Sequence, residues 1–164
     1  MVGPHKREDV TGRKGDSVRV LIVDSNLELS IFTAQLLLGV NRPVPRVEMI
    51  SLAGDLETAA RLLPEHDAVL CEAQFPVSRN STVLEEEWDS IYCDAVSRGI
   101  RFVLYSGCTR SLDEARTNGI AAVSKPGAVE DLHASLAGRN LKVPRRETLS
   151  SCAVAEKLPV GGPL

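Results

Sequence analysis

The sequence contains no long apolar run. Nothing in it approaches the roughly 18 uncharged apolar residues that a membrane-spanning helix needs. The N-terminus, from Met1 to Asp9, is polar and lacks the apolar core of a secretion signal. The 164 residues are 43% hydrophobic and 25% charged, which is typical of one soluble globular domain with some additional chain. We therefore expect a cytoplasmic protein with no membrane partner.

Cysteine is scarce, and its spacing is not that of a metal site. The four cysteines form no CxxC pair and no finger-like pattern with the three histidines; they are Cys71, Cys93, Cys108 and Cys152. We expect no cysteine-built zinc site. A reducing compartment such as the cytosol is the natural setting for such a sequence.

Positive charge is scarce in the middle of the chain. The net charge is −3, of which residues 1–17 contribute +1 and residues 139–164 contribute +3, so residues 18–138 carry −7. A surface of this sign is poorly suited to a phosphate backbone. We therefore expect no nucleic-acid partner.

The two ends of the chain lack apolar periodicity. Residues 1–17 are rich in charge and glycine, and residues 139–164 hold three prolines and two glycines among scattered hydrophobic residues. We expect a disordered leader at 1–17, a flexible tail at 139–164 and a single domain at 18–138. The tail carries no DNA-binding motif, which argues against a transcription factor.

Between these ends, short apolar runs alternate with helical apolar spacing. Strands are predicted at 18–23, 47–51, 68–71, 102–105 and 120–123. For the first helix, the spacing predicts a buried face at Leu27, Ile31, Ala34 and Leu38. Two further patterns predict capping boxes for the first and fourth helices: Ser25-x-x-Glu28 and Ser111-x-x-Glu114.

Three other helices are predicted by the same reasoning. Their apolar faces are Leu56, Ala59, Ala60 and Leu63; Trp88, Ile91, Tyr92 and Ala95; and Val129, Leu132 and Leu136. Five alternating strand–helix units indicate an α/β fold with a doubly wound parallel sheet and helices on both of its faces.

Polar residues follow four of the five predicted strands. They are Asp24-Ser25, Glu72, Ser106 and Lys125-Pro126. In open parallel sheets the working site lies outside the carboxyl ends of the strands. With strand order 2-1-3-4-5, these side chains would meet in one crevice.

In this arrangement residues 18–138 resemble the receiver domain of two-component response regulators. That family has an acidic pair after the first strand, a phosphoacceptor Asp ending the third, Thr or Ser ending the fourth, and Lys-Pro after the fifth. The matching segments are Val20 to Ser25, Val69 to Pro76, Val103 to Gly107 and Val123 to Pro126. The resemblance implies a flavodoxin-like (βα)5 sheet in the order 2-1-3-4-5.

The sequence departs from the family pattern at the positions that matter for phosphorylation. Glu72 stands at the phosphoacceptor position in place of Asp, and Ser25 replaces the second acid of the pair. Ala122 stands where the family has its switch aromatic, and Gly127 follows Pro126 where Phe is common. The segment after Pro76 is longer than usual and lacks the family's Asp-Gly turn. These departures indicate a degenerate receiver.

The crevice residues carry specific expectations. A buried carboxylate needs a partner, so Glu72 should form an ion pair with Lys125, and Ser106 should hydrogen-bond within the crevice. Asp24 could belong to the acidic pocket or merely accept from backbone amides. Asp24 and Glu72 could form a weak Mg²⁺ site, since Mg²⁺ usually takes one or two carboxylates; no other cofactor is expected. The bond before Pro126 is cis in the family that the chain resembles, whereas the sequence alone leaves both isomers open.

The expected function is that of a stand-alone receiver-like protein in phosphorelay signal transduction, without enzymatic activity. Acting as a pseudo-receiver, it would bind a protein partner, such as a signalling protein or histidine kinase, independently of phosphorylation. The resemblance implies contact through the fourth helix, fifth strand and fifth helix. One alternative is a phosphorylatable receiver or phosphate sink for a histidine kinase. Another is a flavodoxin-like domain that binds a small ligand, although no glycine-rich phosphate loop follows the first strand.

Overall fold

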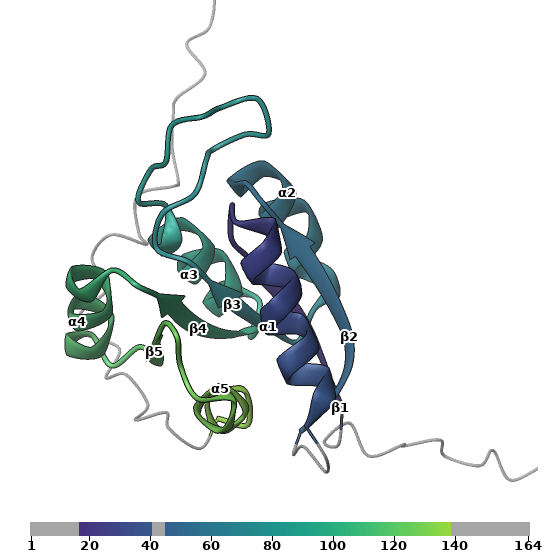
Figure 1. Cartoon of the computed structure of the whole chain (residues 1–164). Helices are drawn as coiled ribbons and strands as arrows, with labels where there is room; N and C mark the ends of the chain where they lie inside the picture. The colour runs from purple at the N-terminus through teal and green to yellow at the C-terminus, as the bar shows by residue number, and fades with distance from the viewer. Residues whose placement is uncertain (1–16, 41–44, 139–164) are drawn as a thin grey trace, which may run out of the picture.

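A computed structural model describes residues 17–40 and 45–138. Within these ranges, strands and helices alternate along the chain (Figure 1). The strands are β1 (Ser17–Val23), β2 (Arg46–Ala53), β3 (Ala68–Cys71), β4 (Arg101–Ser106) and β5 (Ala122–Ser124). The helices are α1 (Leu27–Gly39), α2 (Leu56–Leu62) followed by a 3₁₀ turn (Leu63–Glu65), α3 (Trp88–Ser97), α4 (Thr109–Thr117) and α5 (Val129–Leu136). Ser17, the last residue of the leader expected at 1–17, is instead the first residue of β1. The rest of that leader and the tail expected at 139–164 lie outside the described residues.

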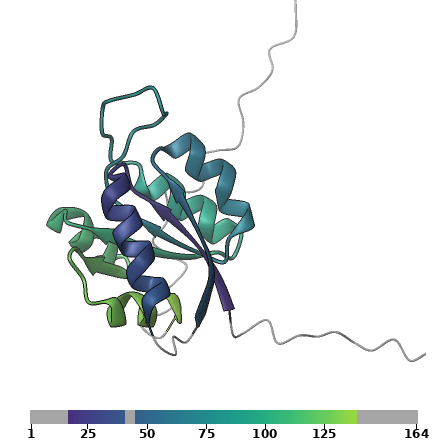
Figure 2. The same ribbon diagram turned by 45° about the vertical axis from the view of Figure 1, so that its right-hand side comes forward.

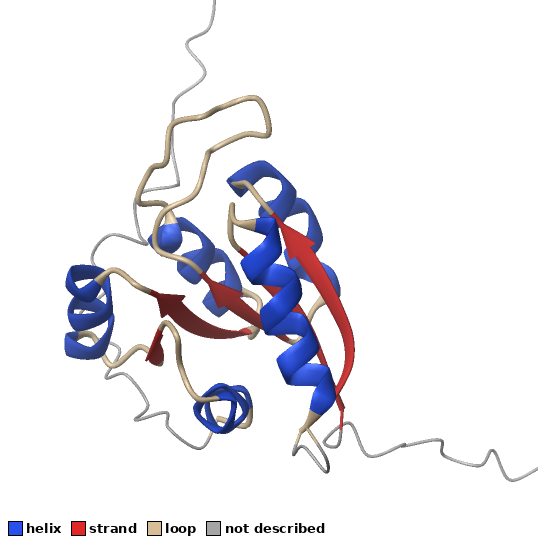
Figure 3. Ribbon diagram, in the orientation of Figure 1, coloured by secondary structure: helices blue, strands red, loops and turns tan. Residues whose placement is uncertain are grey.

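The strands form one parallel sheet in the order β2-β1-β3-β4-β5, as predicted (Figure 3). Its register brings the carboxyl ends of β2, β1 and β3 level with one another, because Val23 pairs with both Ala53 and Cys71. The last residues of β4 and β5, Ser106 and Ser124, pair with each other two residues further along. The fold is therefore the doubly wound, flavodoxin-like architecture expected from the sequence.

Apolar side chains fill both faces of the sheet. On one face, α2, α3 and α4 cover a cluster that includes Leu21, Phe75 and Ile91; on the other, α1 and α5 cover Val20, Leu37 and Leu132. Figure 2 shows α1 and α5 on the side opposite α2 and α3. In α3 the predicted face is confirmed, since all four of its residues are buried: Trp88, Ile91, Tyr92 and Ala95. None of the described helices is long and apolar enough to cross a bilayer.

The face predicted for α1 is wrong. The residues that α1 buries are Ser30, Thr33 and Leu37, whereas Leu27 and Leu38 of the predicted face are largely exposed. The helix is apolar on nearly every side, so periodicity could not choose a face. Packing of α1 against β1, β2 and α5 sets its rotation.

Both predicted capping boxes are wrong as well. Asn26 caps α1, because its side chain accepts from the Leu29 amide at 3.1 Å, and Ser25 is exposed. In α4, Ser111 lies inside the helix and is fully buried, and its hydroxyl donates to Glu86 at 2.7 Å. Each helix starts at a position fixed by where the preceding strand ends, which local pattern matching cannot see.

The segment between β3 and α3 protrudes beyond the sheet edge (Figures 1 and 2). Its two ends are tied together by paired backbone hydrogen bonds of 3.1 Å between Phe75 and Glu85. The Leu56 amide at the start of α2 donates to the Pro76 carbonyl at 2.9 Å. The length that the sequence shows after Pro76 is thus accommodated in an anchored loop.

His133 of α5 is buried on the face that α5 shares with α1. Burial lowers the pKa of His133 below its ordinary value, and the backbone of Leu37 and the charge of Glu130 only partly offset this. The unfolded chain therefore binds the proton more readily. The stability that the fold gains by keeping His133 neutral is fully present above about pH 6.5, the ordinary pKa of histidine. This stability is lost as the pH falls through the pKa of His133 in the folded protein.

We expect the free energy of unfolding to fall between pH 7.5 and pH 5 through this residue. Urea denaturation of the wild type and of His133→Leu at both pH values measures the effect. The variant should lose that part of the pH dependence. An identical pH dependence in the two proteins would contradict the assignment.

Candidate functional site

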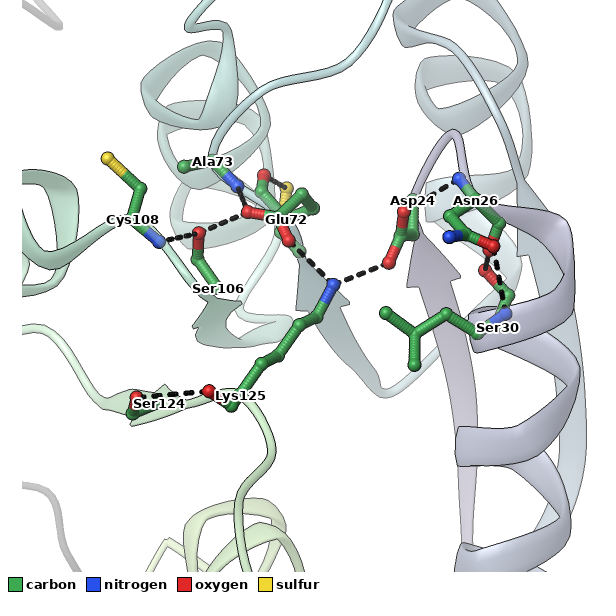
Figure 4. Close-up of polar contacts among 11 residues, drawn as sticks. Asp24, Asn26, Ser30, Glu72, Ala73, Ser106, Cys108, Ser124 and Lys125 are labelled. Carbon is green, nitrogen blue, oxygen red and sulfur yellow. Dashed lines mark hydrogen bonds and ion pairs between the residues drawn. The ribbon is translucent and has the colours of Figure 1, made fainter.

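Three backbone hydrogen bonds extend the sheet pairing past the strand ends. The Asp24 amide donates to Ala53 at 2.9 Å, the Glu72 amide to Val23 at 2.8 Å, and the Lys125 amide to Ser106 at 2.9 Å. These bonds fix the backbone at the residues that follow β1, β3 and β5. As a result, the polar side chains predicted at three different strand ends point into one crevice (Figure 4).

Lys125 lies at the centre of this crevice. Its Nζ donates to Asp24 Oδ2 at 2.5 Å and to Glu72 Oε2 at 2.6 Å. The side chains of Lys125, Asp24 and Glu72 are only 12%, 7% and 17% exposed. The ion pair expected between Glu72 and Lys125 is therefore present, and Asp24 makes it a triad of two carboxylates around one ammonium group.

The second oxygen of Glu72 is also engaged. Oε1 accepts from the Ala73 amide at 2.7 Å and from the Ser106 hydroxyl. Ser106 in turn accepts from the Cys108 amide at 3.0 Å. The predicted hydrogen bond of Ser106 within the crevice is thus present, and both oxygens of Glu72 have partners inside the protein.

Asp24 contacts both the backbone and a charged side chain. Its Oδ1 accepts from the Asn26 amide at 2.8 Å, which orders the turn into α1, while Oδ2 takes part in the ion pair with Lys125. Ser25, its neighbour in the predicted acidic pocket, is exposed. The pocket therefore combines Asp24 with Glu72.

The charges hold Lys125 in its protonated form. Burial alone would lower the pKa of the ammonium group, but hydrogen bonds and charge from Asp24 and Glu72 raise it above its ordinary value. The stabilisation from this charge is complete below about pH 10.4 and is lost as the pH rises through the folded-state pKa. Lys125 is therefore a fixed cation at any physiological pH.

The residues do not fit a magnesium ion as they are arranged. Mg²⁺ requires oxygen ligands in near-octahedral geometry, but the Lys125 ammonium occupies the position between the two carboxylates. The remaining carboxylate oxygens accept from Asn26, Ala73 and Ser106. Among the described residues, no cluster of three or more His, Cys, Asp or Glu side chains could hold a metal ion.

Beyond Lys125, small residues line the α4–β5–α5 face. The Lys125–Pro126 bond is cis. A hollow of about 580 Å³ on this face is lined in part by Ala122, Gly127 and Ala128, with Arg116 and Asp131 among its charged residues. Receiver domains have an aromatic residue at the position of Ala122. The smaller alanine side chain leaves part of this hollow open.

Gly127 is required by a close approach of the backbone. A Cβ at this position would lie 2.6 Å from Val123 Cγ1 and 2.8 Å from the Ser124 carbonyl oxygen, both closer than real contacts allow. Phenylalanine is common at this position in the receiver domains that the chain resembles. Its side chain would not fit this backbone.

Sequence reasoning missed two kinds of contact at the site. The amides of Ala73 and Cys108 complete the hydrogen bonding of Glu72 and Ser106; every residue except proline has such a donor, so no sequence signal marks them. It also missed Glu86, which accepts from Ser111 and Arg110 and ties the β3–α3 loop to α4. Hydrogen bonding from Ser111, with the charge of Arg110, lowers the pKa of Glu86 despite partial burial.

Comparison with known proteins gives similarity at the level of structure. No family model and no curated protein matches the sequence. The response regulator PhyR from Brucella abortus aligns with a TM-score of 0.58 and 15% identity over 77% of this chain and 49% of PhyR. This chain thus corresponds to about half the length of PhyR.

Isolated receiver domains align over nearly their whole length. A response regulator receiver domain protein from Clostridium thermocellum gives a TM-score of 0.53 and 16% identity over 73% of this chain and 91% of that one. The receiver domain of RcsB from Salmonella enterica serovar Typhimurium, in the presence of the phosphomimetic BeF₃⁻, gives 0.56 and 13% over 77% and 99%. Identities this low establish similarity of fold, and the fold of this chain is that of response regulator receiver domains.

Proposed function

We propose that this chain is a signalling receiver of the two-component type that acts as a pseudo-receiver, binding a protein partner without being phosphorylated. The proposal rests on the contacts that the Glu72 carboxylate makes. Both of its oxygens are bound by Lys125, Ser106 and the Ala73 amide. In the receiver domains that this chain resembles, the lysine and the hydroxyl group at these positions would interact with a phosphoryl group. Here they interact with a carboxylate of the chain itself.

Geometry also disfavours Glu72 as an acceptor. Its extra methylene moves the carboxylate outward by about 1.5 Å relative to an aspartate, and a misplacement of about 1 Å can cost on the order of 100-fold in rate. Transfer to Glu72 would in addition have to break its ion pair with Lys125. The proposed module is therefore not an enzyme and needs no cofactor.

The engaged state imitates a phosphorylated pocket only in part. A carboxylate carries one negative charge, whereas a phosphoryl group carries about −1.5 to −2. Ala122 offers no aromatic ring to respond to the state of Ser106. We therefore propose a fixed module, which a partner recognises in a single state.

The proposed contact face is α4–β5–α5. The hollow beside Ala122 and Gly127 gives this face a concave site for a side chain of a protein partner. The net charge of −7 within residues 18–138 supports a protein partner rather than a nucleic acid.

Incubation with acetyl phosphate and Mg²⁺, followed by intact mass measurement, tests the proposal. We expect the wild-type mass to stay unchanged. A gain of about 80 Da, corresponding to one phosphoryl group, that disappears in Glu72→Gln would establish the alternative, a phosphorylatable receiver. An adduct that persists in Glu72→Gln but disappears in Asp24→Asn would place the phosphoryl group on Asp24 and would overturn the proposal equally.

A further inference from the structure

Helix α1 exposes an apolar stripe. Leu27, Ile31 and Leu38 are 60%, 43% and 58% exposed, and Ala34 between them is half-buried. Spacings of four, three and four residues place these side chains along one line of the helix. Helices that are apolar on nearly all sides are normally buried on all sides.

The chemistry of the stripe limits what can cover it. Among residues 27–39 the only charged side chain is Glu28, in the first turn. A helix that lies on a lipid surface typically carries Lys or Arg on its polar face, and α1 has none. A partner recognised by charge would find a single carboxylate at one end of the helix.

We propose that the stripe is covered by the same stripe of a second copy of this chain, with the two α1 helices packed antiparallel across a two-fold axis. A two-fold contact requires a surface that complements itself. In the antiparallel register, Leu27 faces the partner's Leu38, and Ile31 faces the partner's Ala34. Large side chains thus lie opposite small ones at the centre, which permits close packing.

The single charge favours the antiparallel orientation. In a parallel pair the two Glu28 side chains would lie next to each other. In the antiparallel register they lie nine residues apart along the axis, which is about 14 Å at 1.5 Å per residue. The inference does not depend on the proposed function, since it rests on exposed side chains of α1 and on none of the residues around Glu72.

The expected dimer is weak. A helix of 13 residues is about 20 Å long, and such a contact is smaller than the roughly 800 Å² per partner of standard stable interfaces. Each copy has a net charge of −3, so long-range repulsion opposes association at low salt. Added salt should therefore strengthen the dimer, whereas it would weaken a contact based on charge attraction.

Sedimentation equilibrium of the full chain from 10 µM to 1 mM tests the proposal. We expect the average mass to rise from 17.7 kDa towards twice that value, and to rise further at higher salt. Ile31→Glu and Ile31→Lys should each remain monomeric, because two like charges then lie close together on either side of the two-fold axis. An equimolar mixture of the two variants should restore the dimer. Val96→Glu, at an exposed apolar residue of α3, should dimerise like the wild type.

Other results would overturn the inference. A wild-type mass of one chain at all concentrations excludes the dimer, and a lower melting temperature of Ile31→Glu would then show that the same chain covers the stripe. Dimers that persist in Ile31→Glu would use another face. Failure of the mixed variants to associate would exclude contact between the two copies of residue 31.

Discussion

Replacing Lys125 with methionine should lower the free energy of unfolding by about 3–5 kcal/mol, the cost typical of removing one partner from a buried ion pair. Lys125 is the cation between Asp24 and Glu72, at 2.5 and 2.6 Å. Methionine keeps much of the apolar stem but leaves two poorly exposed carboxylates facing each other. Urea denaturation at pH 7 measures the loss.

A second variant shows whether the loss comes from the stranded charges. Adding Glu72→Gln to the variant should recover part of the stability, since one of the two charges is then removed.

Arg116→Met is the matched control for this prediction. It removes a side chain that forms an exposed ion pair with Asp113 at 3.5 Å, and its effect should stay within about 0.5 kcal/mol. If Lys125→Met were as mild as Arg116→Met, the triad would contribute nothing to the stability of the fold.

Restoring two aspartates should convert the chain into a protein that accepts a phosphoryl group. In the variant Ser25→Asp/Glu72→Asp, the shorter side chain at 72 withdraws by about 1.5 Å from Ser106 and Lys125. Aspartate at 25 supplies the second acid of the pair that holds Mg²⁺ in response regulator receiver domains. We expect a gain of about 80 Da, one phosphoryl group, with acetyl phosphate and Mg²⁺, where the wild type shows none.

The single variants divide this effect between its two causes. Glu72→Asp alone should react weakly, because Ser25 leaves the metal with too few carboxylates. Ser25→Asp alone should not react, because Glu72 remains bound to Lys125. A double variant that folds, binds Mg²⁺ and yet stays unmodified would show that side-chain geometry at 72 and 25 is not what prevents phosphorylation.

The alternation of strands and helices could be predicted from the sequence because it depends on local patterns. The run from Ala68 to Cys71 is apolar throughout, and it is the strand buried on both faces. The face of α3 was equally clear, since its four buried side chains follow helical spacing and polar residues fill most of the positions between them. At the site, the partnership of Glu72 with Lys125 followed from the cost of burying an unpaired carboxylate.

Where local patterns were ambiguous, prediction failed. Ser25 and Ser111 both match the capping box, but Asn26 caps α1 and Ser111 donates to Glu86 from within α4. Both outcomes depend on where a strand end or a neighbouring loop lies in space. The same holds for the second contact of Lys125, with Asp24, which lies 101 residues away in the sequence.

The order of the elements, the strand ends that carry polar groups and the pairing of one carboxylate with one lysine all follow from the amino-acid sequence alone. Which side of α1 is buried, and how both oxygens of Glu72 are occupied, depends on the packed fold. This is because an evenly apolar helix has no preferred face until its neighbours are in place. Backbone amides, likewise, become specific donors only once the fold has aimed them.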